Sequence, residues 1–138
     1  MEISPLFHNT RPEGELLPQE AAAFDLLESL GIAYDRVTSD PADNMEKCAA
    51  VSAVLGMPIC KNLFLCNAQK TKFYLLLMPG HKKFKTKVLS KQIGSARLSF
   101  ADDDHMKEYL KLTPGSVSVM GLMNDPEGHV KLLIDSDV

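Results

Sequence analysis

The sequence predicts an α+β fold, in which helices pack on a curved, mixed and largely antiparallel β-sheet. Two helix-spaced apolar patterns in the N-terminal part indicate this class, together with a series of short apolar runs separated by turn residues in the rest of the chain. With 138 residues, 45% of them hydrophobic, the chain can bury a core without disulfides or a structural metal. We therefore expect one domain over residues 18–138, preceded by a loosely held arm over residues 1–17.

Two helices and one strand are predicted in the N-terminal part. The first helix ends at Gly31, and its apolar face comprises Ala23, Phe24, Leu27 and Leu30. A short strand over residues 32–37 follows. Asp43 and Glu46 are spaced as a capping box, which predicts the start of a second helix that ends at Gly56.

A hairpin, a basic helix and further strands are predicted in the C-terminal part. Apolar runs at residues 63–66 and 73–78, separated by a polar segment, are typical of an antiparallel hairpin in a buried sheet. The remaining predicted elements are a basic helix over residues 85–93, a strand over residues 96–100, a helix capped by Ser99 and Asp102 that reaches Leu110, and strands over residues 116–122 and 130–134.

The charges are unevenly distributed along the chain. Between Lys61 and Phe100 there are nine basic residues and no acidic residue, although the whole chain has a net charge of −3. A one-signed segment attracts polyanions such as RNA, whereas a surface that only confers solubility usually mixes both signs. RNA binding is one hypothesis, and a solvated lysine-rich helix and hairpin is the other. The candidate RNA contacts are Lys82, Lys83, Lys85 and Lys87.

The sequence indicates no metal site, cofactor or disulfide framework. Its cysteines, Cys48, Cys60 and Cys66, are odd in number and lack C-x-x-C spacing, and its four histidines lack metal-ligand spacing. The nucleophile-elbow, P-loop and dinucleotide-binding patterns are also missing. Because there is no long apolar run and no secretory signal pattern, we expect a soluble, cytoplasmic protein.

Two places in the sequence are candidates for binding or chemistry. Lys61 and Asn62 lie where a loop enters an apolar strand, and an ammonium at the edge of a core suits binding a phosphate or stabilising developing negative charge. An exposed strand-end lysine is the alternative, and Asn62 can equally satisfy its own turn. In the turn at residues 113–118, Gly115 allows close approach of the backbone to a ligand, although Pro-Gly turns are common.

Four motifs occur in order at compatible spacing. They are CKNLFL at residues 60–65, FYLLLMPG at 73–80, RLSFA at 97–101 and TPGSVS at 113–118, the last continuing to GLMND at 121–125. Together they resemble the YbaK family, the freestanding relatives of the editing domain inserted in bacterial prolyl-tRNA synthetases. They closely resemble the branch of this family that removes alanine mischarged on proline tRNA. The resemblance implies a barrel-like sheet and hydrolysis, without metal or cofactor, of the ester between a wrong amino acid and the terminal ribose.

The resemblance also implies roles for particular residues. Lys61 matches the family's essential lysine, which would orient the tRNA end or offset charge at the reacting ester, and Asn62 matches its polar neighbour. Gly115, Ser116 and Val117 match the loop that lines the aminoacyl pocket. An activated ester needs little beyond orientation, oxyanion stabilisation and a water, which agrees with the missing nucleophile motif.

The walls of the amino-acid pocket are expected at Leu27, Ile32, Tyr34 and Met45, because the family selects a small amino acid by excluding bulkier ones. Cysteinyl-tRNA is a second candidate substrate, and a non-catalytic module that binds tRNA or a synthetase is a candidate from another class. The expected partners are mischarged proline tRNA and, as a second candidate, prolyl-tRNA synthetase. No membrane or DNA partner is expected.

The sequence departs from the family pattern in two places. Relatives usually continue past the equivalent of Val138 into a segment with a Gly-x-His-Pro-like motif and a final helix near the site, and we expect this segment to be missing here. Many relatives also have a histidine in the turn where this chain has residues 38–41, which allows a different substrate choice.

Overall fold

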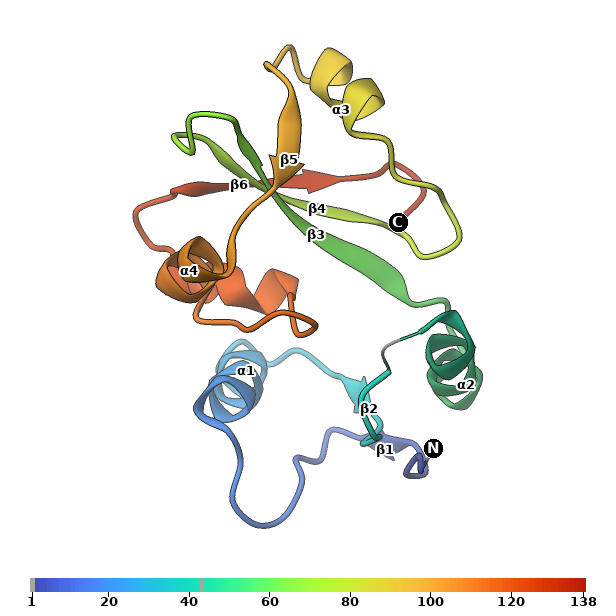
Figure 1. Ribbon diagram of the computed structural model, residues 1–138. Coiled ribbons are helices and arrows are strands. Elements are labelled where there is room, and N and C mark those ends of the chain that lie inside the picture. Colours follow the sequence, from blue (N-terminus) through green and yellow to red (C-terminus); the bar gives the residue numbers. More distant parts are fainter. Residues whose placement is uncertain (1, 43) are drawn as a thin grey trace. The chain divides into compact units, whose positions relative to one another are not determined.

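The structure is a computed structural model that describes residues 2–42 and 44–138. It divides into two compact units, Met1–Ile59 and Cys60–Val138, which are shown in Figure 1. The assignment of residues 1–17 as an arm and residues 18–138 as one domain stays a prediction. Within the described residues, none of the helices combines the length and the apolar character that crossing a membrane requires.

The first unit contains a two-stranded antiparallel sheet. In it, β1 (Phe7–His8) pairs with β2 (Asp35–Arg36), and an isolated bridge joins Ile3 to Ser39. The strand β2 falls within the predicted strand at residues 32–37 but is shorter. Part of the predicted arm is therefore hydrogen-bonded to the segment that follows the first helix.

Both predicted helices of the first unit are confirmed as α1 (Pro18–Ser29) and α2 (Met45–Leu55). Proline at the start of α1 has the fixed φ that suits a first helical turn. The N-cap of α2 is Asn44, whose side chain accepts a hydrogen bond from the backbone N–H of Lys47. The cap predicted at Asp43 lies outside the described residues.

A four-stranded mixed sheet, in the order β5-β3-β4-β6, forms the centre of the second unit (Figure 1). The strands β3 (Cys60–Asn67) and β4 (Phe73–Pro79) form the predicted antiparallel hairpin. At one edge, β5 (Leu98–Phe100) pairs antiparallel with β3, and at the other β6 (Val130–Ile134) pairs parallel with β4. The mixed sheet is thus confirmed. Its barrel-like closure is not confirmed, since β5 and β6 remain separate edges over the described ranges.

Two hydrophobic clusters cover opposite faces of this sheet, because alternate strand residues point to opposite sides. The first cluster includes Phe64, Phe73 and Leu75 with Met106 and Leu110; the second includes Leu65, Leu76 and Met78 with Phe84 and Leu89. On the first face, here called the η1 face, lie α4 (Asp103–His105) and the π-helix η1 (Met106–Leu110). On the second, the α3 face, lies α3 (Thr86–Gln92) (Figure 1).

The strand predicted over residues 116–122 is wrong. These residues form a loop and the start of a 3₁₀ helix, η2 (Val119–Asn124). At Gly121 a Cβ atom would lie 2.7 Å from Cδ1 of Leu112 and 3.1 Å from Cβ of Leu110. The close packing of η2 against the end of η1 therefore requires glycine, and this tertiary contact is what overrides the alternating apolar pattern.

Of the two residues predicted to cap the helix after β5, Asp102 is confirmed and Ser99 is wrong. Asp102 is the N-cap, and its carboxylate accepts a hydrogen bond from the backbone N–H of His105, whereas Ser99 lies within β5. A hydrogen bond from Lys70, with further bonds from the backbone and ring of His105, holds the pKa of Asp102 well below its usual range. Lys70, from the basic segment, is therefore paired with an acid outside that segment.

Candidate functional site

Lys61 and Asn62 lie near the start of β3, where the sheet has an open edge. In this part of β3 the partner is β4 alone, because β5 reaches only as far as Leu65 within the described ranges. The pleat places Lys61, opposite Met78, on the α3 face, and Asn62, opposite Leu77, on the η1 face. The two predicted site residues are neighbours in the chain but point to opposite faces, and both are half-buried.

A backbone carbonyl holds the Lys61 ammonium, which donates a hydrogen bond to the carbonyl oxygen of Lys82. The N–H of Lys82 itself donates to the carbonyl of Pro79 at 3.2 Å, which closes the turn after β4. Because Lys61 pairs with Met78, the strand residue just before this turn, the ammonium meets the turn directly. An ammonium has three donors, so two are left for a ligand as far as residues 2–42 and 44–138 are concerned.

The Lys82 side chain is bound to two carboxylates. Its Nζ lies 2.9 Å from Oδ1 of Asp135 and 2.5 Å from Oδ2 of Asp137. Hydrogen bonds to Asp137 and Asp135 raise the pKa of Lys82. The pKa of Asp135 is lowered, first by the backbone N–H of Asp137 and then by Lys82. Lys82, predicted as a contact for RNA phosphates, thus already has anionic partners.

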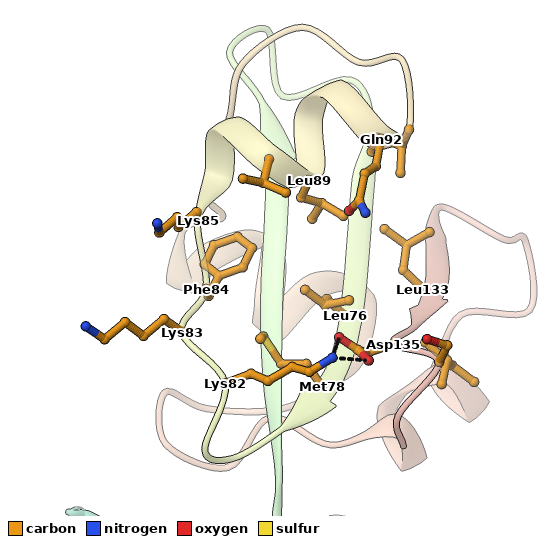
Figure 2. Close-up of a pocket in the computed structure, with 14 residues that line it drawn as sticks. Leu76, Met78, Lys82, Lys83, Phe84, Lys85, Leu89, Gln92, Leu133 and Asp135 are labelled. Carbon is orange, nitrogen blue, oxygen red and sulfur yellow. Dashed lines mark hydrogen bonds and ion pairs between the residues drawn. The ribbon is translucent and has the colours of Figure 1, made fainter.

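A hollow of about 480 Å³ opens on the α3 face, between α3, β4 and β6. Figure 2 shows its apolar floor and, at its rim, the Lys82–Asp135 ion pair and the side chains of Lys83 and Lys85, which point outward. Its apolar floor includes Leu76, Met78, Leu89 and Leu133. Lys61 contacts Lys82, so the predicted essential lysine lies next to this rim.

A second hollow, of about 490 Å³, is lined by cations and hydroxyls without an acidic residue. Its lining consists of Thr86, Lys87, Ser90, Lys91, Ser95 and Arg97. No ion pair joins Lys83, Lys85 or Lys87 to a carboxylate among the described residues. These lysines are exposed, and together with this hollow they form the cationic surface that remains after Lys70 and Lys82 are paired. The structure thus extends the predicted surface to Lys91 and Arg97.

The loop with Gly115, Ser116 and Val117 is held by its own hydrogen bonds. The Ser116 hydroxyl donates to the Thr113 carbonyl at 2.8 Å and accepts from the Thr113 N–H at 3.2 Å. Gly115 has a φ of 85°, which favours glycine, and is exposed. Val117 packs against the cluster of the η1 face. The loop therefore shares a face with Asn62, not with Lys61.

The residues after the loop anchor it to the sheet. The buried carboxylate of Asp125 accepts hydrogen bonds from the backbone N–H of His129 at 3.0 Å and of Val130 at 2.8 Å. The side chain of Asn124 donates to the Leu110 carbonyl at 2.9 Å. The GLMND motif therefore has a structural role, because it ties η2 to η1 and to the start of β6.

The four predicted pocket-wall residues all belong to the first unit. Ile32 and Met45 are 49% and 65% exposed, while Leu27 and Tyr34 are half-buried. The Tyr34 ring lies 5.5 Å from that of Phe24, centroid to centroid. Its hydroxyl is shielded from solvent and has no hydrogen-bond partner within the described parts of the chain. Such a hydroxyl is available to a bound ligand or water.

The sequence profile of one family, described as "Aminoacyl-tRNA editing domain", matches residues 39–138. The chain belongs to this family. The match confirms the resemblance to the YbaK family and includes Lys61, Asn62 and the loop at residues 113–118.

Relatives of this editing domain are found in bacteria and mammals. The chain is 36% identical over 112 residues to the "Prolyl-tRNA editing protein ProX" of Acetoanaerobium sticklandii, which covers 81% of this chain and 68% of that protein. It is also 36% identical over 78 residues to the "Prolyl-tRNA synthetase associated domain-containing protein 1" of Mus musculus, covering 55% of this chain. The chain spans about half of the mouse protein, 46% of its length.

Solved structures share the fold at low sequence identity. A scaffold protein from work on epitope backbone grafting by computational design has a TM-score of 0.66 and 21% identity, covering 88% of this chain and 74% of that one. The crystal structure of the hypothetical protein APE2540 has a TM-score of 0.61 and 19% identity, covering 83% and 73%. Both support the mixed α+β fold.

The two carboxylates that bind Lys82 were not predicted from the sequence. Asp135 lies 53 residues from Lys82 along the chain, so no local pattern joins them. One sequence feature could have indicated them, since two acids follow shortly after the last predicted strand. Because β6 lies parallel to β4, the C-terminal end of β6 comes close to the turn after β4.

Proposed function

We propose that the protein is a trans-editing aminoacyl-tRNA deacylase that hydrolyses the ester of mischarged proline tRNA, with alanyl-tRNA(Pro) as its substrate. Membership of the editing-domain family and the 36% identity to a prolyl-tRNA editing protein support this proposal. The single most important structural observation is that the Lys61 ammonium is held at an open strand end, where the described part of the chain supplies a partner to one of its three N–H donors. We also propose that the enzyme acts in the cytoplasm and meets charged tRNA there.

In the proposed reaction, water adds to the ester carbonyl carbon, and the bond from that carbon to the ribose oxygen breaks. The ribose oxygen takes up a proton, so the products are the free amino acid and intact tRNA. Lys61 would offset the negative charge that develops on the substrate. Asn62 and the loop with Gly115, Ser116 and Val117 would orient the aminoacyl end from the η1 face, around the same strand end.

The identity of the edited amino acid is tested by charging proline tRNA separately with alanine, cysteine and proline. We expect release of alanine, while prolyl-tRNA stays intact, because a pocket that fits a small side chain excludes a bulkier ring. Leu27, Ile32, Tyr34 and Met45 are proposed as its walls, and the Tyr34 hydroxyl, for which no described residue is a hydrogen-bond partner, is available to a ligand. Faster release of cysteine would assign the enzyme to cysteinyl-tRNA(Pro). A folded protein that releases none of the three would contradict the proposed deacylase.

The tRNA is proposed to bind through Lys83, Lys85 and Lys87, with Lys91 and Arg97 beside them. Three phosphate contacts predict that affinity falls about 20- to 40-fold when salt rises from 50 to 200 mM. Lys85→Ala should lower the slope of log K against log salt by about one. Filter binding with uncharged proline tRNA measures this slope, and Lys70→Ala is the control, because Lys70 is already paired with Asp102. A flat salt dependence would refute the electrostatic interface.

A non-catalytic module that binds tRNA or prolyl-tRNA synthetase is the second candidate function. The cationic surface on and around α3 favours it, since that surface is independent of Lys61. Such a module would show the salt dependence just described without release of any amino acid. The two assays together therefore separate the candidates.

A further inference from the structure

The turn between β4 and α3 links Lys61 to the C-terminal end of the sheet. We propose that Lys82, clamped by Asp135 and Asp137, is a positioning residue that fixes the Lys61 ammonium through its own backbone carbonyl. This inference rests on the proposed function, because it assigns Lys61 to the reaction. It replaces the predicted role of Lys82 as a phosphate contact.

The clamp comprises the hydrogen bond from Lys61 to the turn and the ion pairs from Lys82 to Asp135 and Asp137, which lie on the two sides of the turn. On one side, Lys61 of β3 donates to the Lys82 carbonyl. On the other, the Lys82 side chain reaches past the end of β4 to the two carboxylates. Asp135 is itself held to the sheet, because its N–H donates to the Leu77 carbonyl at 2.9 Å and extends the β4–β6 ladder beyond Ile134. The turn is therefore tied to strands on both of its flanks.

A positioned carbonyl matters because a lysine side chain has four flexible carbons. Left to itself, the ammonium would sample several rotamers, and charge stabilisation depends on a donor held at one place. The Lys82 carbonyl restricts Lys61 only while the turn is ordered. Its closing hydrogen bond, from the Lys82 N–H to Pro79, is a single bond of 3.2 Å, so the ion pairs supply the additional restraint.

The environment of Lys82 differs from that of its basic neighbours. The Lys82 side chain is 35% exposed and the Asp135 side chain 21%, whereas Lys83 and Lys85 are exposed at the rim of the same hollow. Hydrogen bonds to Asp137 and Asp135 also raise the pKa of Lys82, and the Asp137 N–H, followed by Lys82, lowers the pKa of Asp135, so both groups stay charged at neutral pH. A lysine whose single charge is shared between two carboxylates is poorly suited to neutralise a phosphate as well.

The test compares Lys82→Met, Lys82→Arg and Asp135→Asn in steady-state deacylation of alanyl-tRNA(Pro). We expect Lys82→Met to lower kcat about tenfold and leave KM within about twofold, because the substrate still binds but the ammonium is misplaced. Lys82→Arg should restore activity to within about threefold of the unmodified protein, since arginine can bind the same carboxylates. A Lys82→Met/Asp135→Asn double variant should be no worse than Lys82→Met alone, as expected for one coupled unit.

The matched control is Lys70→Met, which removes a surface Lys–Asp ion pair of the same unit, in the β3–β4 turn at the opposite end of β4 from Lys82. Its kcat should be unchanged. The proposal would be overturned if Lys82→Met raised KM at constant kcat and lowered the slope of log K against log salt. Those two changes are expected when a contact to a tRNA phosphate is lost. Unchanged kinetics in both Lys82→Met and Asp135→Asn would overturn the proposal equally.

A second measurement does not depend on catalysis. Brief acetylation with acetic anhydride, followed by peptide mass spectrometry, reports how freely Lys61 reacts. Lys82→Met should increase labelling of Lys61 about threefold, because the turn opens locally more often, while Lys70→Met should not. Equal labelling in all three proteins would contradict the clamp. If no amino acid is released even by the unmodified protein, the proposed function fails, and the labelling result still decides whether Lys82 positions Lys61.

Discussion

Replacing Lys61 with alanine is expected to lower kcat/KM for deacylation of alanyl-tRNA(Pro) by at least about 100-fold, the usual effect of removing one group that stabilises transition-state charge. The ammonium lies at an open strand end, and only one of its three donors has a partner among the described residues. The substitution therefore removes a cation that the reaction would use. Release of labelled alanine, followed under single-turnover conditions, measures the loss.

The fold should survive this substitution, which keeps the activity loss interpretable. Lys61 is half-buried at the end of β3, while the core of the hairpin is formed by residues farther along the strand, such as Phe64 and Leu65. Thermal unfolding monitored by circular dichroism should give a transition similar to that of the original chain. Lys70→Ala serves as the matched control for loss of one positive charge from the same segment. Retention of more than a third of the activity in Lys61→Ala would exclude Lys61 from the reaction.

The hairpin of β3 and β4 could be predicted because its information is local. Continuous apolar runs on both sides of a polar segment specify buried antiparallel strands, and the structure adds Cys60, Lys61 and Asn62 to the first of them. The segment after Gly115 was mispredicted for the opposite reason. Its alternating apolar residues are typical of a strand, but the close approach of Gly121 to Leu110 and Leu112 decides its conformation.

The candidate site was only partly predictable, for a related reason. Lys61 and the loop could be identified from motifs, but the acids that neutralise part of the basic segment lie outside it. Asp102 pairs with Lys70, and Asp135 with Lys82, across 32 and 53 residues respectively. A charge count along the chain therefore overestimates the cationic surface, because it contains no information about which side chains meet after folding.

The largest loss of stability is expected from Asp125→Ala. The Asp125 side chain is buried and accepts hydrogen bonds from two backbone N–H groups, those of His129 and Val130, at the start of β6. Alanine offers no acceptor, and Val130 is itself only 6% exposed, so water replaces the lost bonds poorly. Leaving a buried donor such as the Val130 N–H unsatisfied costs about 1–3 kcal/mol, and loss of the hydrogen bond from His129, an exposed residue, adds about 1 kcal/mol, so we expect the free energy of unfolding to fall by about 2–4 kcal/mol.

Urea unfolding measures this change as a lower midpoint with an unchanged slope, since the same surface is exposed on unfolding. Asp125→Asn keeps one acceptor oxygen but turns an amide toward the second N–H, so we expect it to recover less than half of the loss. Asp103→Ala is the control, because Asp103 is exposed and has no such hydrogen bonds among the described residues. A change of less than about 0.5 kcal/mol in Asp125→Ala, the range of ordinary surface substitutions, would show that the turn is held by other contacts. Because β6 pairs with β4 and is followed directly by Asp135, loosening the start of β6 by this substitution is also expected to weaken the clamp on Lys82 at the other end of the strand.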